Sequence, residues 1–276
     1  GDRCALTGDV RNCGYMSTHQ DRTHMSTPIL TELNWKNVQE TEFEIAILPW
    51  GATEAHNYHL PYGTDNYQVE RIAARAASLA GEKGAQALVL PTVPFGVNCQ
   101  QQDIPLTMNL NPSTQALLLE DLVTSVENSG ISKMLILNGH GGNDFKQMIR
   151  EIQASSPVFL CAANWYTMSD PANVFDHSGD HAGELETSMM MYLFPDLVRP
   201  LEEAADGFAK QFRIKAMKEK KVWAPRQWTS VTESTGVGNP YLSSVEKGSS
   251  FFDAVTTELA HFLVDLSTAN IDDMYA

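Results

Sequence analysis

Histidine and carboxylate residues gather directly after two predicted strands, where they could bind a metal ion or move a proton. After the first strand, Glu54 and His56 are two residues apart, so an extended segment would point both side chains the same way. Asp65 follows at the predicted start of a helix. After a later strand, the sequence NGHGGN at 138–143 combines His140 with glycines that allow a tight turn and leave the imidazole exposed.

A third cluster lies further along, in GDHAGELETS at 179–188. His181 and Glu184 are three residues apart, which would place them on one face of a helical turn. Histidine and carboxylate ligands without cysteine suit divalent ions such as zinc, manganese or iron(II). A lone histidine at a strand end is more often a satisfied polar residue than a ligand, but three clusters together favour a metal site. An aspartate between two ligand sets can bridge two ions, which would polarise a carbonyl and activate a water.

The remaining histidines are expected to have structural or solvent-exposed positions. His59 and His177 are predicted to support the site or the fold. His261, on the last helix beside core residues, is predicted to be packed or half-exposed. His19 and His24 lie in a polar N-terminal stretch and are expected to be solvated.

Strand and helix patterns alternate along the chain, which predicts an α/β fold with a mostly parallel sheet flanked by helices. In such a sheet, ligands gather beyond the carboxyl ends of the strands, so the three clusters should converge there. The predicted strands cover 44–50, 87–93, 134–140 and 158–165; the predicted helices cover 66–80, a segment beginning at Asn111-Pro112, 144–154, 184–194 and 252–266.

The whole chain of 276 residues is interpreted as one catalytic domain with a short N-terminal extension. Residues 1–24 are polar and without periodicity, which indicates an N-terminal arm or an added leader, and the domain is predicted to cover 25–276. The four cysteines form no CxxC pair and no disulfide framework, although Cys4 and Cys13 could pair locally.

Charge and hydropathy exclude several classes of partner. Asp plus Glu is 34 and Lys plus Arg is 19, so the formal net charge is −15, which disfavours binding to nucleic acid or to an anionic membrane. Apolar runs are too short for a membrane span, and an apolar secretory signal is lacking, so a cytoplasmic protein is expected. The basic run at 213–223 is interpreted as a solvated helix face rather than a binding patch.

At these clusters the sequence resembles the creatininase (creatinine amidohydrolase) family. The matching motifs occur in family order and extend over nearly all of 27–270: LPWGATEAHNYHLPYGTD at 48–65, LNGHGGN at 137–143, HAGELETS at 181–188 and TGVGNPYLSSVEKG at 235–248. The resemblance implies a single α/β domain with a dinuclear metal centre that hydrolyses a non-peptide amide C–N bond. It also implies a homohexamer built as a trimer of dimers.

Carried over residue by residue, the resemblance assigns most of the site. Glu54 and His140 would bind one metal, His56 would bind the other, and Asp65 would bridge them. His181 would be the catalytic histidine, which gives a proton to the leaving nitrogen or handles the attacking water.

The sequence departs from the creatinine-hydrolysing members at one metal-binding position. Those members carry a Glu two residues after the strand-tip histidine, where this chain has Gly142. We expect Glu184 to replace that ligand, because it would lie one helical turn from His181. Glu186 is expected to assist catalysis from beside the site or to be the alternative ligand. On this expectation, Glu184→Gln should lower metal occupancy more than Glu186→Gln does.

Two further departures concern the substrate. Residues 95–110 contain Gln100, Gln101 and Gln102 where many members have a Glu-His pair, which suggests recognition by neutral hydrogen bonds. Asn239 occupies a position where Asp is usual. Both departures argue against creatinine itself as the substrate. Which of Trp165, Tyr166, Trp223 and Trp228 line the pocket stays open at this point.

The sequence therefore predicts divalent-metal-dependent hydrolysis of a C–N bond in a small amide by a metal-activated water. A lactam, a formamide or a short peptide is a candidate substrate. A dinuclear phosphoesterase is an alternative, which the acidic balance and the lack of arginine near the clusters disfavour. A hexameric binding protein whose metals only stabilise the assembly is another, which His181 disfavours, because a structural metal site needs no free imidazole.

Overall fold

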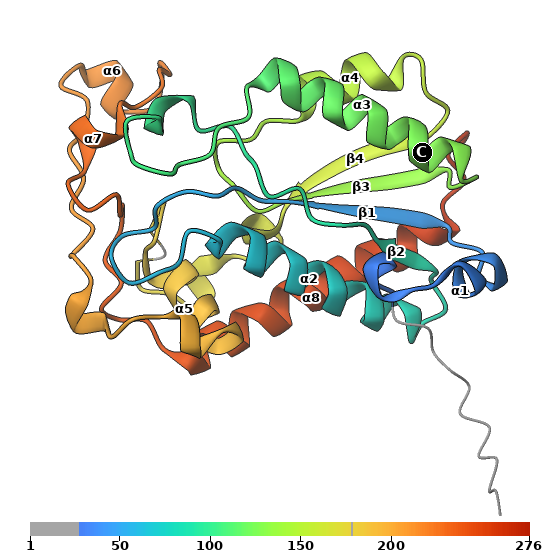
Figure 1. The fold of residues 1–276 in the computed structure, drawn as a ribbon, viewed down its shortest axis with the longest axis horizontal. Helices are drawn as coiled ribbons and strands as arrows, with labels where there is room; N and C mark the ends of the chain where they lie inside the picture. Colours follow the sequence, from blue (N-terminus) through green and yellow to red (C-terminus); the bar gives the residue numbers. More distant parts are fainter. Residues whose placement is uncertain (1–27, 178) are drawn as a thin grey trace, which may run out of the picture.

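The computed structural model describes residues 28–177 and 179–276, so the predictions for residues 1–24 lie outside the described part. Within that part, four parallel strands form one sheet in the order β2-β1-β3-β4. The strands are β1 (Ile45–Trp50), β2 (Ala87–Val89), β3 (Lys133–Asn138) and β4 (Phe159–Asn164). The predicted α/β fold with a parallel sheet flanked by helices is confirmed (Figure 1).

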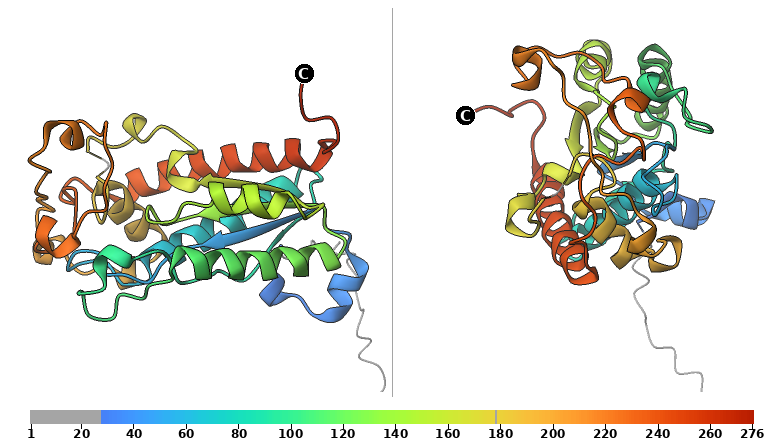
Figure 2. Two further views of the ribbon diagram at one scale, coloured as in Figure 1. Left: turned by 90° about the horizontal axis from the view of Figure 1, so that it is seen from above. Right: turned by 90° about the vertical axis from the view of Figure 1, so that its left-hand side faces the viewer.

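Helices cover both faces of this sheet, as Figure 2 shows from two further directions. Helices α3 (Pro112–Asn128) and α4 (Lys146–Gln153) pack on one face, and α2 (Thr64–Gly81) and α8 (Val245–Thr268) lie on the other. The remaining helices are α1 (Trp35–Glu40), α5 (Glu184–Leu193), α6 (Lys215–Lys218) and α7 (Trp228–Val231), with short 3-10 turns at Leu30–Glu32, Cys99–Gln101, Trp165–Thr167, Pro171–Asn173, Pro195–Leu197 and Leu201–Glu203.

The central strands β1 and β3 are buried along their whole length, which fits the apolar sequence of β1 and of the middle of β3, Met134–Leu137. Two cores follow from this. Ile45, Val69 and Val255 represent the core under α2 and α8, whereas Leu119 and Met148 belong to the core under α3 and α4. The two faces of the sheet are therefore held by separate sets of helices.

Two predicted elements have different bounds in the structure. The regular part of the second strand ends at Val89, since Pro91 has no amide hydrogen to donate to the sheet. The last helix begins seven residues earlier than predicted, because the Ser244 side chain accepts a hydrogen bond from the Lys247 amide and caps it. Gly248 then allows close packing on α5, since a β-carbon there would lie 2.0 Å from the Ser188 carbonyl oxygen.

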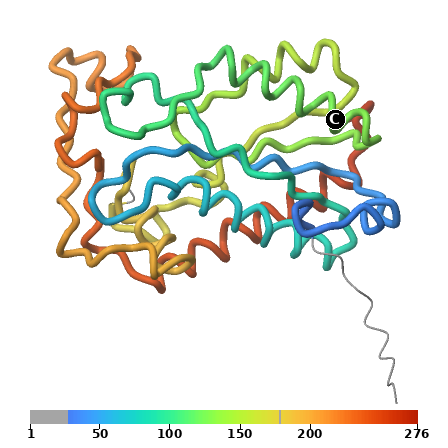
Figure 3. Tube along the Cα trace, in the orientation of Figure 1, coloured from blue at the N-terminus to red at the C-terminus, as the bar shows by residue number. Residues whose placement is uncertain are grey.

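One end of the sheet is covered by a long irregular segment. Residues 195–244 run past the carboxyl ends of the strands and carry only short helices, as the orange part of the trace in Figure 3 shows. The described helices include none that is both long enough and apolar enough to cross a membrane.

Candidate metal centre

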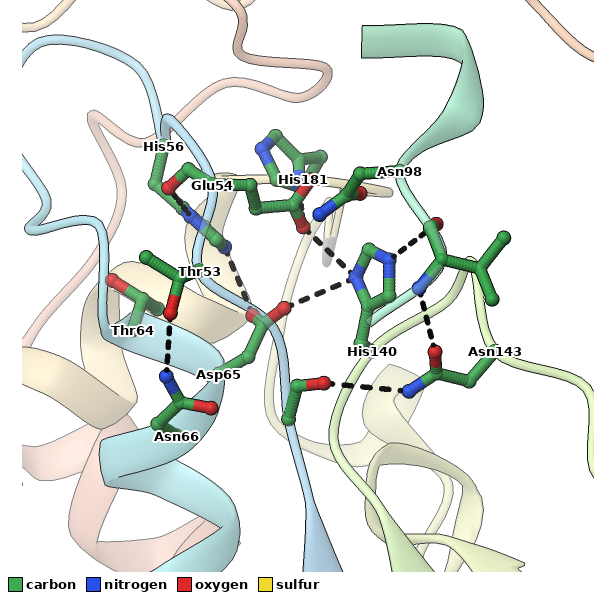
Figure 4. Close-up of polar contacts among 12 residues, drawn as sticks. Thr53, Glu54, His56, Thr64, Asp65, Asn66, Asn98, His140, Asn143 and His181 are labelled. Carbon is green, nitrogen blue, oxygen red and sulfur yellow. Dashed lines mark hydrogen bonds and ion pairs between the residues drawn. The ribbon is translucent and has the colours of Figure 1, made fainter. Parts of the chain in front are cut away.

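The three predicted clusters meet beyond the carboxyl ends of β1 and β3, where Figure 4 shows their side chains pointing toward one another. Glu54 and His56 come from the loop after β1, and His140 comes from the turn after β3. Asp65 lies in the first turn of α2, where Thr64 begins the helix. All four of these side chains are buried, so a set of ionisable groups lies together in the protein interior.

His140 is held between a backbone carbonyl and two carboxylates. Its Nε2 lies 3.1 Å from the Val97 carbonyl oxygen, which can only accept, so Nε2 carries the proton. In the neutral ring, the lone pair of Nδ1 then faces Glu54 Oε1 at 2.9 Å and Asp65 Oδ2 at 3.1 Å. Three acceptor atoms thus converge, which is unfavourable unless a cation or a further proton lies between them.

His56 repeats this arrangement with the other oxygen of Asp65. Its Nδ1 lies 3.0 Å from the Glu54 carbonyl oxygen, and its Nε2 lies 3.0 Å from Asp65 Oδ1 and 3.9 Å from Glu186 Oε2. The backbone carbonyl again fixes which nitrogen is protonated, and the free nitrogen again faces carboxylates. Metal-binding histidines commonly have their second nitrogen fixed in this way.

His181 has the same pattern at a longer distance. Its Nε2 lies 2.8 Å from the Ala55 carbonyl oxygen, and its Nδ1 lies 3.7 Å from Glu54 Oε1. Its backbone forms an antiparallel bridge with Val237, in which the two residues exchange hydrogen bonds of 3.0 and 2.7 Å. The following residue, Ala182, has a φ of 52°, which turns the chain sharply into α5.

The ligand-capable atoms form three groups, each within 4.8 Å: Glu54, Asp65 and His140; His56, Asp65 and Glu186; and Glu54, His56 and His181. Asp65 belongs to two of them and offers a different oxygen to each, as a bridging ligand would. Within the described part of the chain, the buried oxygens Glu54 Oε1 and Asp65 Oδ2 have no well-directed hydrogen bond. The residues present therefore fit a pair of divalent cations.

The electrostatics of the cluster point the same way. Burial by itself lowers the pKa of His56, but Asp65, Glu186 and Glu54 outweigh burial and raise it to about 10. The same competition raises the pKa of His140 well above its usual range, through Glu54 and Asp65. Burial raises the pKa of Glu54, yet His140 and His181 lower it overall. The carboxylates thus favour positive charge at this place, which divalent ions would supply.

The two glutamates of α5 have different environments. Glu186 joins the group with His56 and Asp65, and its Oε2 also accepts a hydrogen bond of 2.5 Å from the Ala182 amide. Burial, together with the nearby Asp65 carboxylate, raises the pKa of Glu186.

Glu184, the predicted replacement ligand, is in none of the three groups. Its carboxylate instead pairs with Lys247 and accepts a hydrogen bond of 2.8 Å from the His177 amide. The reason is local: α5 begins only at Glu184, and His181 lies in an extended bridge before it, so the two do not share a helix face.

Gly142 leaves no room for a side chain beside His140. A β-carbon there would lie 2.3 Å from the Val97 carbonyl oxygen and 2.4 Å from His140 Nε2. The Val97 carbonyl and the His140 ring therefore occupy the space that a side chain at this position would need. Gly141, its neighbour, faces open space.

Gln100 and Gln101, which follow each other in the loop after β2, have different environments. Gln101 is buried, and its Nε2 donates a hydrogen bond of 2.6 Å to Glu54 Oε2, so it orients a candidate ligand rather than the substrate. Gln100 lines the cavity above the centre, where it is free to contact a substrate. The prediction of neutral hydrogen bonding to the substrate now applies to Gln100.

The other histidines lie outside the three groups. His59 is buried with its Nε2 2.8 Å from Thr187 Oγ1, and burial lowers its pKa to about 4. His177 is exposed, and only its backbone amide contacts Glu184. His261 is exposed on α8, so of its two predicted positions the packed one was wrong.

A cavity of about 740 Å³ opens above the cluster, and the covering segment contributes one wall. Trp223 and Trp228 line it, whereas Trp165 is buried in the core. Arg226 also lines it, although the sequence analysis found no arginine near the clusters. Arg226 was not recognised from the sequence, because the covering segment has no periodic pattern that would place it over the site. It pairs with Asp180, which directly precedes His181.

A parallel α/β sheet with a buried histidine–carboxylate cluster beyond its carboxyl edge defines an enzyme with a candidate dinuclear metal centre. The chain belongs to the creatininase family, because the family model "Creatininase: Creatinine amidohydrolase" matches residues 31–263. It is therefore a hydrolase of the creatininase type.

Known proteins support the assignment. A solved structure assigned as a creatinine amidohydrolase from Bacteroides fragilis is 41% identical, with a TM-score of 0.85, covering 90% of this chain and 99% of that one. A manganese form of creatininase has a TM-score of 0.72 at 22% identity, covering 88% of this chain and 100% of the other, and supports the fold alone. The "mycofactocin precursor peptide peptidase" of Mycolicibacterium smegmatis is 31% identical over 160 residues, which are 55% of this chain and 59% of that protein. The creatinine amidohydrolase of Pseudomonas putida is 28% identical over 60% of this chain and 72% of its own.

Proposed function

We propose that this protein hydrolyses the C–N bond of a small amide at a centre of two divalent ions. The observation that carries the proposal is the shared arrangement of His56, His140 and His181. Each has one ring nitrogen on a backbone carbonyl and the other directed at a carboxylate of the cluster. Asp65 faces both His56 and His140, and Glu54 faces both His140 and His181. A purely structural hydrogen-bond network would not need three lone pairs aimed at buried carboxylates.

The ligand set follows from the three groups of atoms. Glu54 and His140 would hold one ion and His56 and Glu186 the other, with Asp65 shared between them. Glu186 thus takes the place that we expected for Glu184. Two divalent ions bound there would polarise the amide carbonyl and lower the pKa of a water. Zinc, manganese and iron(II) all suit these ligands.

His181 is proposed to move the proton. Its Nε2 is fixed on the Ala55 carbonyl, so Nδ1 is the atom that faces the centre. At this position an imidazole can pass a proton from the attacking water to the leaving nitrogen. The packing of His181 on His56, with ring centroids 4.1 Å apart, and on the edge of Trp228, at 5.4 Å, holds the ring in place.

A lactam or a formamide is the proposed substrate type, with a short peptide as a further candidate, since relatives include an amidohydrolase and a peptidase. Creatinine is not proposed, because Gly142 and the residues around Gln101 differ from the pattern of creatinine-hydrolysing members. We also propose a homohexamer located in the cytoplasm. Light scattering of the purified protein tests the assembly.

Metal analysis followed by a substrate panel tests the function. The holo protein should contain two divalent ions per chain and cleave at least one lactam, formamide or short peptide. Asp65→Asn should lose both ions, whereas His181→Ala should keep them and lose turnover. Cleavage of phosphoesters but of no amide would instead identify a phosphoesterase. Two bound ions without any cleavage would identify a binding protein.

A further inference from the structure

We propose that the substrate carries a carboxylate group and that Arg226 binds it. The inference rests on the proposed function, because it assumes that the scissile amide lies at the metal centre. It defines the substrate more narrowly, as an amide with an anionic group at some distance from the C–N bond. Arg226 would be the specificity-determining residue.

Arg226 lies where its side chain can contact a substrate in the cavity. Together with Glu54 and Asp65, it lines the cavity above the centre. Among the described residues that line this cavity, it is the sole lysine or arginine. Its guanidinium lies 4.6 Å from the ring centroid of Trp228, and that ring makes a T-shaped contact with the His181 ring. Stacking of this kind fixes the plane of a guanidinium and leaves its edge free to bind.

Asp180 orients Arg226 without using all of its donors. One guanidinium nitrogen of Arg226 lies 2.6 Å from Asp180 Oδ2. A guanidinium has five N–H donors, and a carboxylate engages at most two of them in a paired arrangement. The Arg226 side chain is 36% exposed, so its remaining donors are accessible from the cavity. A substrate carboxylate would complete an arrangement that the protein has already positioned.

A second hollow extends this positive region away from the centre. It has a volume of about 1000 Å³ and adjoins the first cavity, with which it shares the lining residues Asp180, Trp223 and Arg226. Its lining adds four more basic residues: Lys210, Arg213, Lys218 and Lys220. Among the described residues that line it, Asp180 is the sole acidic one.

This local excess of positive charge is unusual in a chain whose formal net charge is −15. The run at 213–223, which the sequence analysis interpreted as a solvated face, contributes three of these cations. An anionic group would be drawn along this hollow toward Arg226, whereas Asp180 alone does not balance so many cations.

A series of matched ligands tests the inference. The probes are N-formyl ω-amino acids, from N-formylglycine to N-formyl-6-aminohexanoate, each paired with its neutral primary amide. Their dissociation constants are measured calorimetrically on the zinc-loaded protein. In at least one pair, the carboxylate should bind about tenfold more tightly than the amide, which corresponds to about 1.4 kcal/mol. The ratio should fall toward one in Arg226→Met and stay intermediate in Arg226→Lys.

Two further variants control for charge and for competition. Asp180→Asn removes the carboxylate that already engages Arg226, so it should raise the ratio. Lys36→Met removes one charge on the exposed helix α1 and should leave the ratio unchanged. Thermal unfolding of each variant verifies that it is folded.

The outcomes separate this inference from the proposed function. A carboxylate preference that Arg226→Met abolishes supports the inference even if no probe is cleaved, in which case only the hydrolytic proposal is weakened. Three results would overturn the inference: equal affinity for the carboxylate and its paired amide, a carboxylate preference that is unchanged in Arg226→Met, or no measurable binding of any probe. An unchanged preference would mean that the carboxylate binds the metals directly.

Discussion

Replacing the two glutamates of α5 one at a time separates a metal ligand from a structural ion pair. Glu186→Gln and Glu184→Gln change the same chemical group on the same helix, two residues apart. Of these two glutamates, only Glu186 lies with His56 and Asp65, so only its loss would remove a candidate ligand from the centre. We therefore expect Glu186→Gln to lower metal occupancy and Glu184→Gln to lower stability.

The magnitudes follow from the contacts. Removing even a group that supports a metal ligand typically costs about 10- to 100-fold in affinity, so loss of Glu186 should cost about 100-fold or more for one ion. Glu184 is fully buried and pairs with Lys247, so its neutral replacement leaves the ammonium without its buried partner. That change should cost roughly 1–3 kcal/mol of unfolding free energy. For a protein of this size, each kcal/mol lowers Tm by about 2–4 °C.

The assay measures both properties on both variants. Competition with a chromophoric chelator gives the two dissociation constants, elemental analysis gives the ions per chain, and calorimetry of the chelated proteins gives Tm without metal. Glu186→Gln should bind close to one ion with nearly normal Tm, and Glu184→Gln should bind two with a lowered Tm. Equal metal content in the two variants, or a greater loss in Glu184→Gln, would refute the assignment of Glu186.

Three further substitutions test other parts of the structure. Gly142→Ala forces a β-carbon onto Val97 and His140, so chelator competition should show weakened metal binding. Gly141 faces open space, so Gly141→Ala should bind metal with normal affinity. Equal metal affinities of the two variants would contradict the close packing around Gly142. Gln101→Leu removes the hydrogen-bond donor to Glu54 and should lower the affinity for one of the two ions by about tenfold or more. Gln100→Leu should leave both affinities unchanged. Phe251→Ala empties a fully buried site between Trp165 and Phe175 and should cost about 3–5 kcal/mol in urea unfolding, whereas a loss below about 1 kcal/mol would argue against this packing.

The fold was largely predictable because the central strands are buried on both faces. The apolar runs at 44–50 and 134–140 have no polar alternation, which is typical of strands inside a parallel sheet. The helix expected over 66–80 was confirmed for a similar reason, since Val69, Ile72 and Ala76 lie on one buried face. The early part of α8 was missed because its start depends on a single cap, Ser244, and on packing of Gly248 against α5.

The candidate site was predictable where ligands follow strands directly. Glu54, His56 and His140 are positioned by the ends of β1 and β3, so their convergence follows from sheet topology alone. In the third cluster, the structure differs from the prediction at Glu184, because the spacing argument assumed a continuous helix from His181 onward. Ala182, with its positive φ, separates an extended segment from a helix, and the i, i+3 relation between His181 and Glu184 does not hold across such a turn.

Backbone rather than side chains fixes the orientation of all three histidines in the cluster. The acceptors are the carbonyls of Glu54, Val97 and Ala55, so each tautomer depends on loop geometry and not on the identity of a neighbouring residue. Side chains around the cavity can therefore change without disturbing the metal-binding atoms. Gln100 and Arg226 line the cavity and are candidates for selecting the substrate. We therefore expect the substrate of this protein to be determined at the cavity wall rather than at the candidate metal centre.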